Sequence, residues 1–113
     1  MAISVTVMVG DAQEWIPEIV EKTKGLSIGP GHEDKDIAPL NSKEALDRAL
    51  NIINKSEQQG AKVLVDGRGA KVSGYEKGNW LGPTIIDHVK PGMECYDLEI
   101  FSPVMIICRV DTL

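Results

Sequence analysis

Hydrophobic and polar residues alternate along residues 3–9, where isoleucine or valine stands at every second position. This period of two and the β-branched side chains predict a strand that ends at Gly10. Asp11 followed by Glu14 resembles a capping box at the start of a helix. We expect a short first turn and then a regular helix over residues 15–24. Its apolar face is formed by Trp15, Ile16, Ile19, Val20 and Thr23.

The clearest helical pattern in the sequence comes after a polar loop over residues 29–41. Ser42 can cap a helix here, and Gly60 can end it. The predicted buried face consists of Leu46, Ala49, Leu50 and Ile53. If that face is fully packed, Leu50→Ala is expected to cost about 2–5 kcal/mol of stability.

Three more segments have the pattern of strands. Residues 61–65 alternate, and residues 80–86 are extended with Pro83 expected on an edge strand or at a bulge. Val104–Val110 is apolar on both faces as far as Cys108, which is typical of a parallel strand covered by helices. The order strand, helix, helix, strand, strand, strand predicts an α/β fold, a mostly parallel sheet with flanking helices.

The composition fits one globular domain of 113 residues, with 42% hydrophobic and 26% charged residues. Because the net charge is -5, we expect neither a nucleic-acid partner nor a membrane partner. The longest apolar run, residues 104–108, is too short to span a bilayer. Acidic residues precede the first basic residue, Lys22, so no targeting signal is visible and a cytoplasmic location is expected for the chain as given.

Two local clusters have the residue types of ligand sites but not the spacing. His32, Glu33, Asp34 and Asp36 could offer oxygen ligands to a hard cation, yet no glycine or distal glutamate stands where an EF-hand loop needs it. A solvated acidic loop is the preferred interpretation, and no metal site is expected. Residues 67–71 (Gly-Arg-Gly-Ala-Lys) fail the P-loop pattern, so a flexible connecting loop is preferred there.

The sequence gives little support for either of the two cysteines as a nucleophile. Acidic residues surround Cys95, and nearby negative charge opposes thiolate formation. The Asp87-His88 pair lies seven residues before it, so a Cys95–His88 thiol enzyme is conceivable. Cys108 lies in the apolar run and is expected in the core. We predict that neither thiol is activated.

A carboxylate and an aromatic ring stand two residues apart, at Glu99 and Phe101, just before the last strand. Ligands of open α/β sheets gather at junctions between strands and loops. Local physical chemistry alone nevertheless favours Phe101 as a core residue and Glu99 as a solvated acid.

Several segments resemble, in the same order, NAD(P)-dependent aldehyde dehydrogenases. Residues 98–104 (Leu-Glu-Ile-Phe-Ser-Pro-Val) are similar to that family's Glu-Glu-Ile-Phe-Gly-Pro-Val motif. The methylmalonate-semialdehyde dehydrogenase branch is the most similar. Residues 1–4 resemble the segment immediately after the catalytic cysteine, and the other matching segments are 36–40, 74–79, 82–86 and 89–96.

The resemblance implies that residues 1–113 are part of an aldehyde dehydrogenase catalytic domain and begin just after the nucleophilic cysteine. In the family, the cysteine thiolate attacks the aldehyde, hydride passes to NAD, and the thioester is released by water or, in this branch, by coenzyme A. Glu99 matches the glutamate that hydrogen-bonds the nicotinamide ribose, and Phe101 matches the phenylalanine beside the nicotinamide. Ser102 replaces a glycine of the motif, which is costly if the position needs a positive φ. Leu98 and Ala38 also depart from the pattern.

The sequence supports three function hypotheses. In the first, the chain derives from a full-length enzyme of valine catabolism that binds a semialdehyde and coenzyme A, forms a homo-oligomer and is mitochondrial in eukaryotes. In the second, it is an inactive stand-alone remnant or an interaction module that buries its sheet edge on a partner. The Cys95 thiol enzyme is the third and weakest. No catalytic residue is expected within this chain, so we expect the chain alone to oxidise no aldehyde.

Overall fold

A four-stranded sheet forms the centre of the computed structural model, which describes residues 3–113. The strand order is β1-β4-β3-β2; β4 pairs in parallel with both β1 and β3, and β2 pairs antiparallel with β3. The mostly parallel sheet is therefore confirmed. Residues 1 and 2, half of the segment that resembles the one after the catalytic cysteine, lie outside the described range. The strands are β1 (Thr6–Val9), β2 (Lys62–Val65), β3 (Thr84–Asp87) and β4 (Val104–Val110).

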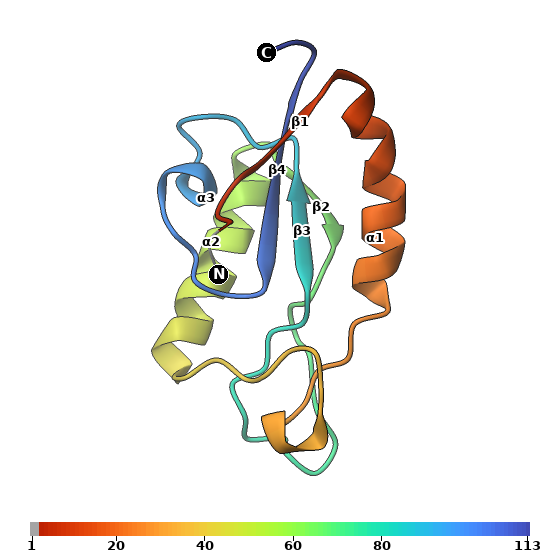
Figure 1. Ribbon diagram of the computed structural model, residues 1–113. Helices are drawn as coiled ribbons and strands as arrows, with labels where there is room; N and C mark the ends of the chain where they lie inside the picture. The colour runs from red at the N-terminus through yellow and green to blue at the C-terminus, as the bar shows by residue number, and fades with distance from the viewer. Residues whose placement is uncertain (1–2) are drawn as a thin grey trace.

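Helices cover both faces of the sheet, as predicted for an α/β fold (Figure 1). One face carries α1 (Ile16–Lys24), which comes after a 3-10 turn over Gly10–Trp15. The other face carries α2 (Lys43–Gln58) and the short α3 (Glu94–Asp97). A second 3-10 turn, Gly31–Glu33, lies in the loop between α1 and α2. Within residues 3–113, no helix combines the length and the apolar character needed to cross a membrane.

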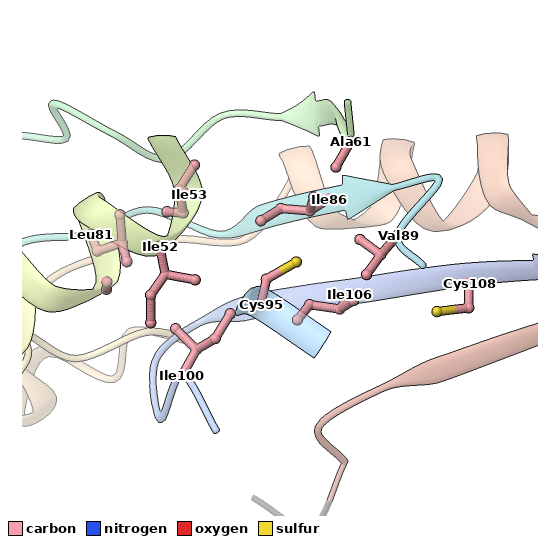
Figure 2. Close-up of a cluster of buried hydrophobic side chains, with 11 residues drawn as sticks. Ile52, Ile53, Ala61, Leu81, Ile86, Val89, Cys95, Ile100, Ile106 and Cys108 are labelled. Carbon is pink, nitrogen blue, oxygen red and sulfur yellow. The ribbon is translucent and has the colours of Figure 1, made fainter. Parts of the chain in front are cut away.

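The core has two parts, one on each face of the sheet. Ile86 of β3 and Ile106 of β4 belong to the cluster beneath α2 and α3, part of which Figure 2 shows. The alternate residues Ile85 and Ile107 belong to the smaller cluster beneath α1. Side chains of neighbouring strand residues point to opposite faces, so both faces of β3 and β4 are buried. The prediction that the last strand is covered on both sides is confirmed as far as Cys108, which is 6% exposed.

Helix α2 has the predicted signals at both ends. The Ser42 hydroxyl accepts a hydrogen bond from the Ala45 N–H at 3.1 Å, which satisfies one free N–H of the first turn. At the other end Gly60 has φ +99°, and the N–H of Ala61 donates to the Ser56 carbonyl, as in a Schellman motif.

The buried face of α2 is displaced from the predicted one. Ala49 and Ile53 are fully buried, but Leu46 and Leu50 are only partly buried at the edge of the cluster. Ile52 takes the central place instead, because the helix presents the 49–52–53–56 side to the sheet. The large cost predicted for Leu50→Ala therefore applies to a different residue, Ile53.

The first strand is shorter than predicted, and its buried residue has the opposite parity. Met8 is buried, whereas Ile3 and Val7 are largely exposed. The reason is tertiary: β1 is an edge strand, and within the described residues the α1 face covers it better than the α2 face does. The predicted Asp11–Glu14 capping box is also wrong, since the 3-10 turn begins at Gly10 without a side-chain cap.

Two features of the C-terminal half differ from expectation. Pro83 is neither on an edge strand nor at a bulge. It directly precedes β3, an interior strand, where its missing N–H interrupts no ladder hydrogen bond. The single turn of α3 was not predicted, because four residues are too few to show a hydrophobic period.

Candidate functional site

A cavity of about 360 Å³ lies where the loop before β4 meets the loop after α1 and the residues before β1. Its volume falls within the range of small-molecule sites in proteins. Glu99 and Phe101, the two residues singled out in the sequence, both line it. The remaining lining residues are Ile3, Ser4, Asp36, Ile37, Ala38, Ile100, Ser102, Pro103 and Val104.

Phe101 is not a core residue, which corrects the expectation from local physical chemistry. Its side chain is 65% exposed, and its backbone has φ +55°. This left-handed conformation is unfavourable for a residue with a Cβ, and residues held in it concentrate at functional sites. Glu99 is exposed, as expected. The loop thus presents a ring and a carboxylate to the cavity while the side chain between them, Ile100, is buried in the core.

The substitution of the motif glycine by Ser102 is compatible with the backbone. Ser102 is not among the described non-glycine residues with positive φ, so the strain of this loop falls on Phe101. The Ser102 hydroxyl oxygen is buried and makes no hydrogen bond to the described residues. A serine is therefore tolerated here at the cost of an unsatisfied hydroxyl.

The opposite wall of the cavity is held by Asp36. Its carboxylate accepts hydrogen bonds from the backbone N–H and the hydroxyl of Ser27, at 2.8 and 2.7 Å. The backbone hydrogen bond, followed by that of the hydroxyl, lowers the pKa of Asp36. Asp36 is therefore ionised, and it joins the two sides of the 3-10 turn within the loop between α1 and α2. Among the described residues, no such hydrogen bond engages the Glu99 carboxylate.

The other acidic residues of this loop do not converge on a metal ion. Glu33 accepts a hydrogen bond from the Tyr75 hydroxyl at 3.1 Å, and His32 stacks edge-on against the same ring. Asp34 lies at the left-handed end of the 3-10 turn. Across residues 3–113, no three His, Cys, Asp or Glu side chains are grouped as metal ligands.

The glycine-rich segment 67–71 has a packing role. The Arg68 guanidinium is engaged by Asp66, Asn54 and Glu57. A Cβ on Gly67 would lie 1.9 Å from the Gly82 carbonyl oxygen, so only glycine fits there. The segment packs between α2 and the start of β3 and does not form a phosphate-binding loop.

The cysteines lie in the core, away from the cavity. Cys95 is fully buried in α3, and Cys108 is buried in β4. Burial, with smaller contributions from Cys95 and Asp87, raises the pKa of the Cys108 thiol. The Asp87 carboxylate is bound by Arg109. The structure therefore gives no support to a Cys95–His88 enzyme.

We expect both thiols of the folded chain to react slowly with an alkylating reagent, because neither sulfur is accessible and thiolate is the reactive form. Mass spectrometry of the chain after brief treatment with iodoacetamide at pH 6 and at pH 8 measures this. The same treatment in denaturant is the control and should label both cysteines. Rapid labelling of Cys95 in the folded chain at pH 6 would contradict the prediction.

Comparison with known proteins gives the same result for sequence and for structure. The model of the aldehyde dehydrogenase family matches residues 1–113. The chain is 46% identical over 114 residues to the mitochondrial acylating methylmalonate-semialdehyde/malonate-semialdehyde dehydrogenase of Bos taurus, and equally similar to that of Homo sapiens. The match covers 100% of this chain and 21% of either relative, so the chain spans about a fifth of their length.

Solved structures of similar proteins have the same fold. A Sinorhizobium meliloti protein assigned as a methylmalonate-semialdehyde dehydrogenase, solved with NAD, superimposes with a TM-score of 0.92 at 42% identity. The superposition covers 97% of this chain and 23% of that one. The methylmalonate-semialdehyde dehydrogenase of Oceanimonas doudoroffii also gives a TM-score of 0.92, at 39% identity, over 99% of this chain and 24% of its own.

Proposed function

The chain belongs to the aldehyde dehydrogenase family, and we propose that it forms one wall of the nicotinamide site in an NAD-dependent enzyme that oxidises methylmalonate or malonate semialdehyde. Because the chain spans about a fifth of its relatives, this activity is proposed for the whole enzyme to which such a segment contributes. The observation that carries the proposal is that Glu99 and Phe101 line the same cavity.

The cavity wall suits the ribose and nicotinamide of NAD. An exposed carboxylate has only acceptor oxygens, so Glu99 can accept hydrogen bonds from both hydroxyls of a ribose diol. The ring of Phe101 can pack beside a flat heterocycle and limit its tilt. When bound, NAD supplies the hydride acceptor, while Glu99 and Phe101 orient it.

The positive φ of Phe101 gives this wall a defined shape. A left-handed residue turns the chain sharply, which lets Ile100 enter the core while the residues on either side face the cavity. A backbone held in this way loses little freedom when the ring contacts a ligand, and preorganisation of this kind favours a productive geometry.

The acyl acceptor, the assembly and the location are parts of the same proposal. The relatives are named as acylating and mitochondrial enzymes. We therefore propose that coenzyme A takes the acyl group from the thioester, as the family resemblance implies, and that a eukaryotic enzyme of this type is mitochondrial. A homo-oligomer and a role in valine catabolism are proposed on the same resemblance.

Glu99→Gln tests the ribose contact. The experiment uses a chimera in which residues 1–113 replace the matched segment of the Sinorhizobium meliloti enzyme, which supplies the rest of the catalytic domain. Glutamine retains the shape but loses the charge and one acceptor, and hydrogen bonds to charged groups contribute about 1.5–3 kcal/mol. We expect kcat/KM for NAD to fall roughly 10- to 100-fold, measured by steady-state kinetics at varied NAD.

Asp97→Asn is the matched control, because Asp97 is an exposed carboxylate two residues away that does not line the cavity. It should leave the kinetics unchanged. Unchanged kcat and KM for NAD in Glu99→Gln would mean that Glu99 has no role in cofactor binding. A folded chimera without turnover would favour the alternative, a catalytically inactive remnant or interaction module.

A further inference from the structure

The side chain of Arg48, on α2, hydrogen-bonds the main chain of the loop between α3 and β4, which lines the cavity. Its two terminal nitrogens donate to two consecutive carbonyls: Nη2 to that of Glu99 at 2.7 Å and Nη1 to that of Ile100 at 2.9 Å. A guanidinium presents these donors in a fixed planar fork, and hydrogen bonds from a charged donor are stronger than neutral ones. One side chain therefore fixes the two peptide units immediately before Phe101, Glu99–Ile100 and Ile100–Phe101.

In the loop between α3 and β4, the main chain of residues 99–101 needs such a contact, because the other backbone hydrogen bonds of this loop lie near its ends. Near its ends, the N–H of Leu98 donates to Glu94, and the carbonyl of Pro103 accepts from Thr84. Between these points lies Phe101, with its left-handed backbone and exposed ring. Backbone strain of this kind persists only where surrounding contacts over-determine the conformation. The Arg48 fork supplies two of those contacts.

The packing of α2 explains why Arg48 reaches this point. Arg48 lies one helical turn before Ile52, on the same side of the helix. Ile52 and Ile100 enter the same buried cluster, as Figure 2 shows. The Ile100 side chain is thus held by the core, and its carbonyl is held by the arginine one turn earlier. Since Ala49 and Ile53 anchor the helix to the sheet, the fork is carried by a rigid element.

We infer that Arg48 is a positioning residue that holds the backbone from which Glu99 and Phe101 face the nicotinamide of NAD. This inference rests on the function proposed above and adds a residue that does not itself line the cavity. Lysine cannot replace arginine here, because a single ammonium group cannot bind two adjacent carbonyls with the same planar geometry.

Arg48→Lys in the same chimera is the test, since it keeps the charge and removes the fork. We expect kcat/KM for NAD to fall about tenfold, while KM for the semialdehyde stays the same. Hydrogen exchange of the amides of residues 99–102 should become faster, and exchange within α2 should not change. Lys43→Met, which removes a charge from the exposed start of the same helix, is the control and should change neither quantity.

Arg48→Ala is a second test, for the case in which the lysine ammonium still hydrogen-bonds one of the two carbonyls. Its kcat/KM for NAD should be partly restored by added guanidinium ion at concentrations that leave the unmodified chimera active. An effect of Glu99→Gln without any effect of the Arg48 variants would overturn the inference and leave the proposed function intact. If neither Glu99→Gln nor the Arg48 variants affect NAD kinetics, the proposed function fails and the inference fails with it.

Discussion

Replacing Ile53 with alanine is expected to lower the free energy of unfolding by about 2–5 kcal/mol. Ile53 is fully buried, in one cluster with Ala49, Leu81 and Ile86, where α2 packs on the sheet. Removing its branched chain takes away buried apolar surface, and the fixed helix and sheet cannot close fully around the cavity that remains. Urea denaturation of the 113-residue chain, followed by far-ultraviolet circular dichroism, measures the change.

Leu50→Ala is the matched control on the same helix. Leu50 is only partly buried, so the same kind of truncation should cost distinctly less. Equal losses for the two variants would mean that the side of α2 facing the sheet has been assigned incorrectly.

Replacing Arg109 with methionine is expected to destabilise the chain by about 3–5 kcal/mol at neutral pH. The Arg109 guanidinium binds both carboxylate oxygens of Asp87, with Nε at 3.1 Å from each. The Asp87 side chain is only 1% exposed. The variant therefore leaves a buried carboxylate that still accepts a hydrogen bond from the His88 backbone N–H but has lost the Arg109 guanidinium. Losing one partner of a buried pair costs more than the pair contributes, because the remaining charge is not solvated.

The loss should depend on pH in a defined direction. Burial raises the pKa of Asp87, but the hydrogen bonds from Arg109 and the His88 N–H, together with the charges of His88 and Arg109, outweigh it and hold that pKa below its usual value. The stabilisation from this depressed pKa is fully present above the unfolded value of about 4 and disappears as pH falls through the folded value. In Arg109→Met the pKa of Asp87 rises, so the stability difference from the unmodified chain should shrink below about pH 4.

Denaturation at pH 7 and at pH 3 tests this dependence. Lys22→Met, which breaks the exposed contact with Glu18, is the control and should have little effect at either pH. An equal loss for Arg109→Met at both pH values would show that the charge of Asp87 is not what Arg109 stabilises.

An element that depends on residues close in sequence was predicted correctly. The α2 helix was predicted from its periodicity and from Ser42, whose cap depends only on residues three positions apart. The parity of the first strand was misjudged because it depends on which helix covers Met8, and that helix packs through contacts between separate segments. Strand alternation says that one face is buried but not which one.

In the candidate site, too, some residues could be predicted from the sequence and one could not. Glu99 and Phe101 were singled out by their place before a strand and by the family resemblance, whereas residue type alone favoured a buried Phe101. Arg48 had no sequence signal. An arginine on an amphipathic helix is ordinarily a solvated residue, and its bonds to the loop cross 51 and 52 positions of the chain. Only the folded arrangement brings them together.

The pairing of β1 with β4 has a consequence for how the sheet assembles. Thr6 aligns with Ile107, so within residues 3–113 the first strand pairs with a strand about a hundred positions further along the chain. Closing so long a loop costs entropy before any ladder hydrogen bond forms, and contacts of this kind make folding slow. On the ribosome, the helices and the β2–β3 pair can form while β1 waits for the residues of β4 to emerge. Until then both edges of β1 are unpaired, and its valines would be open to pairing with other chains.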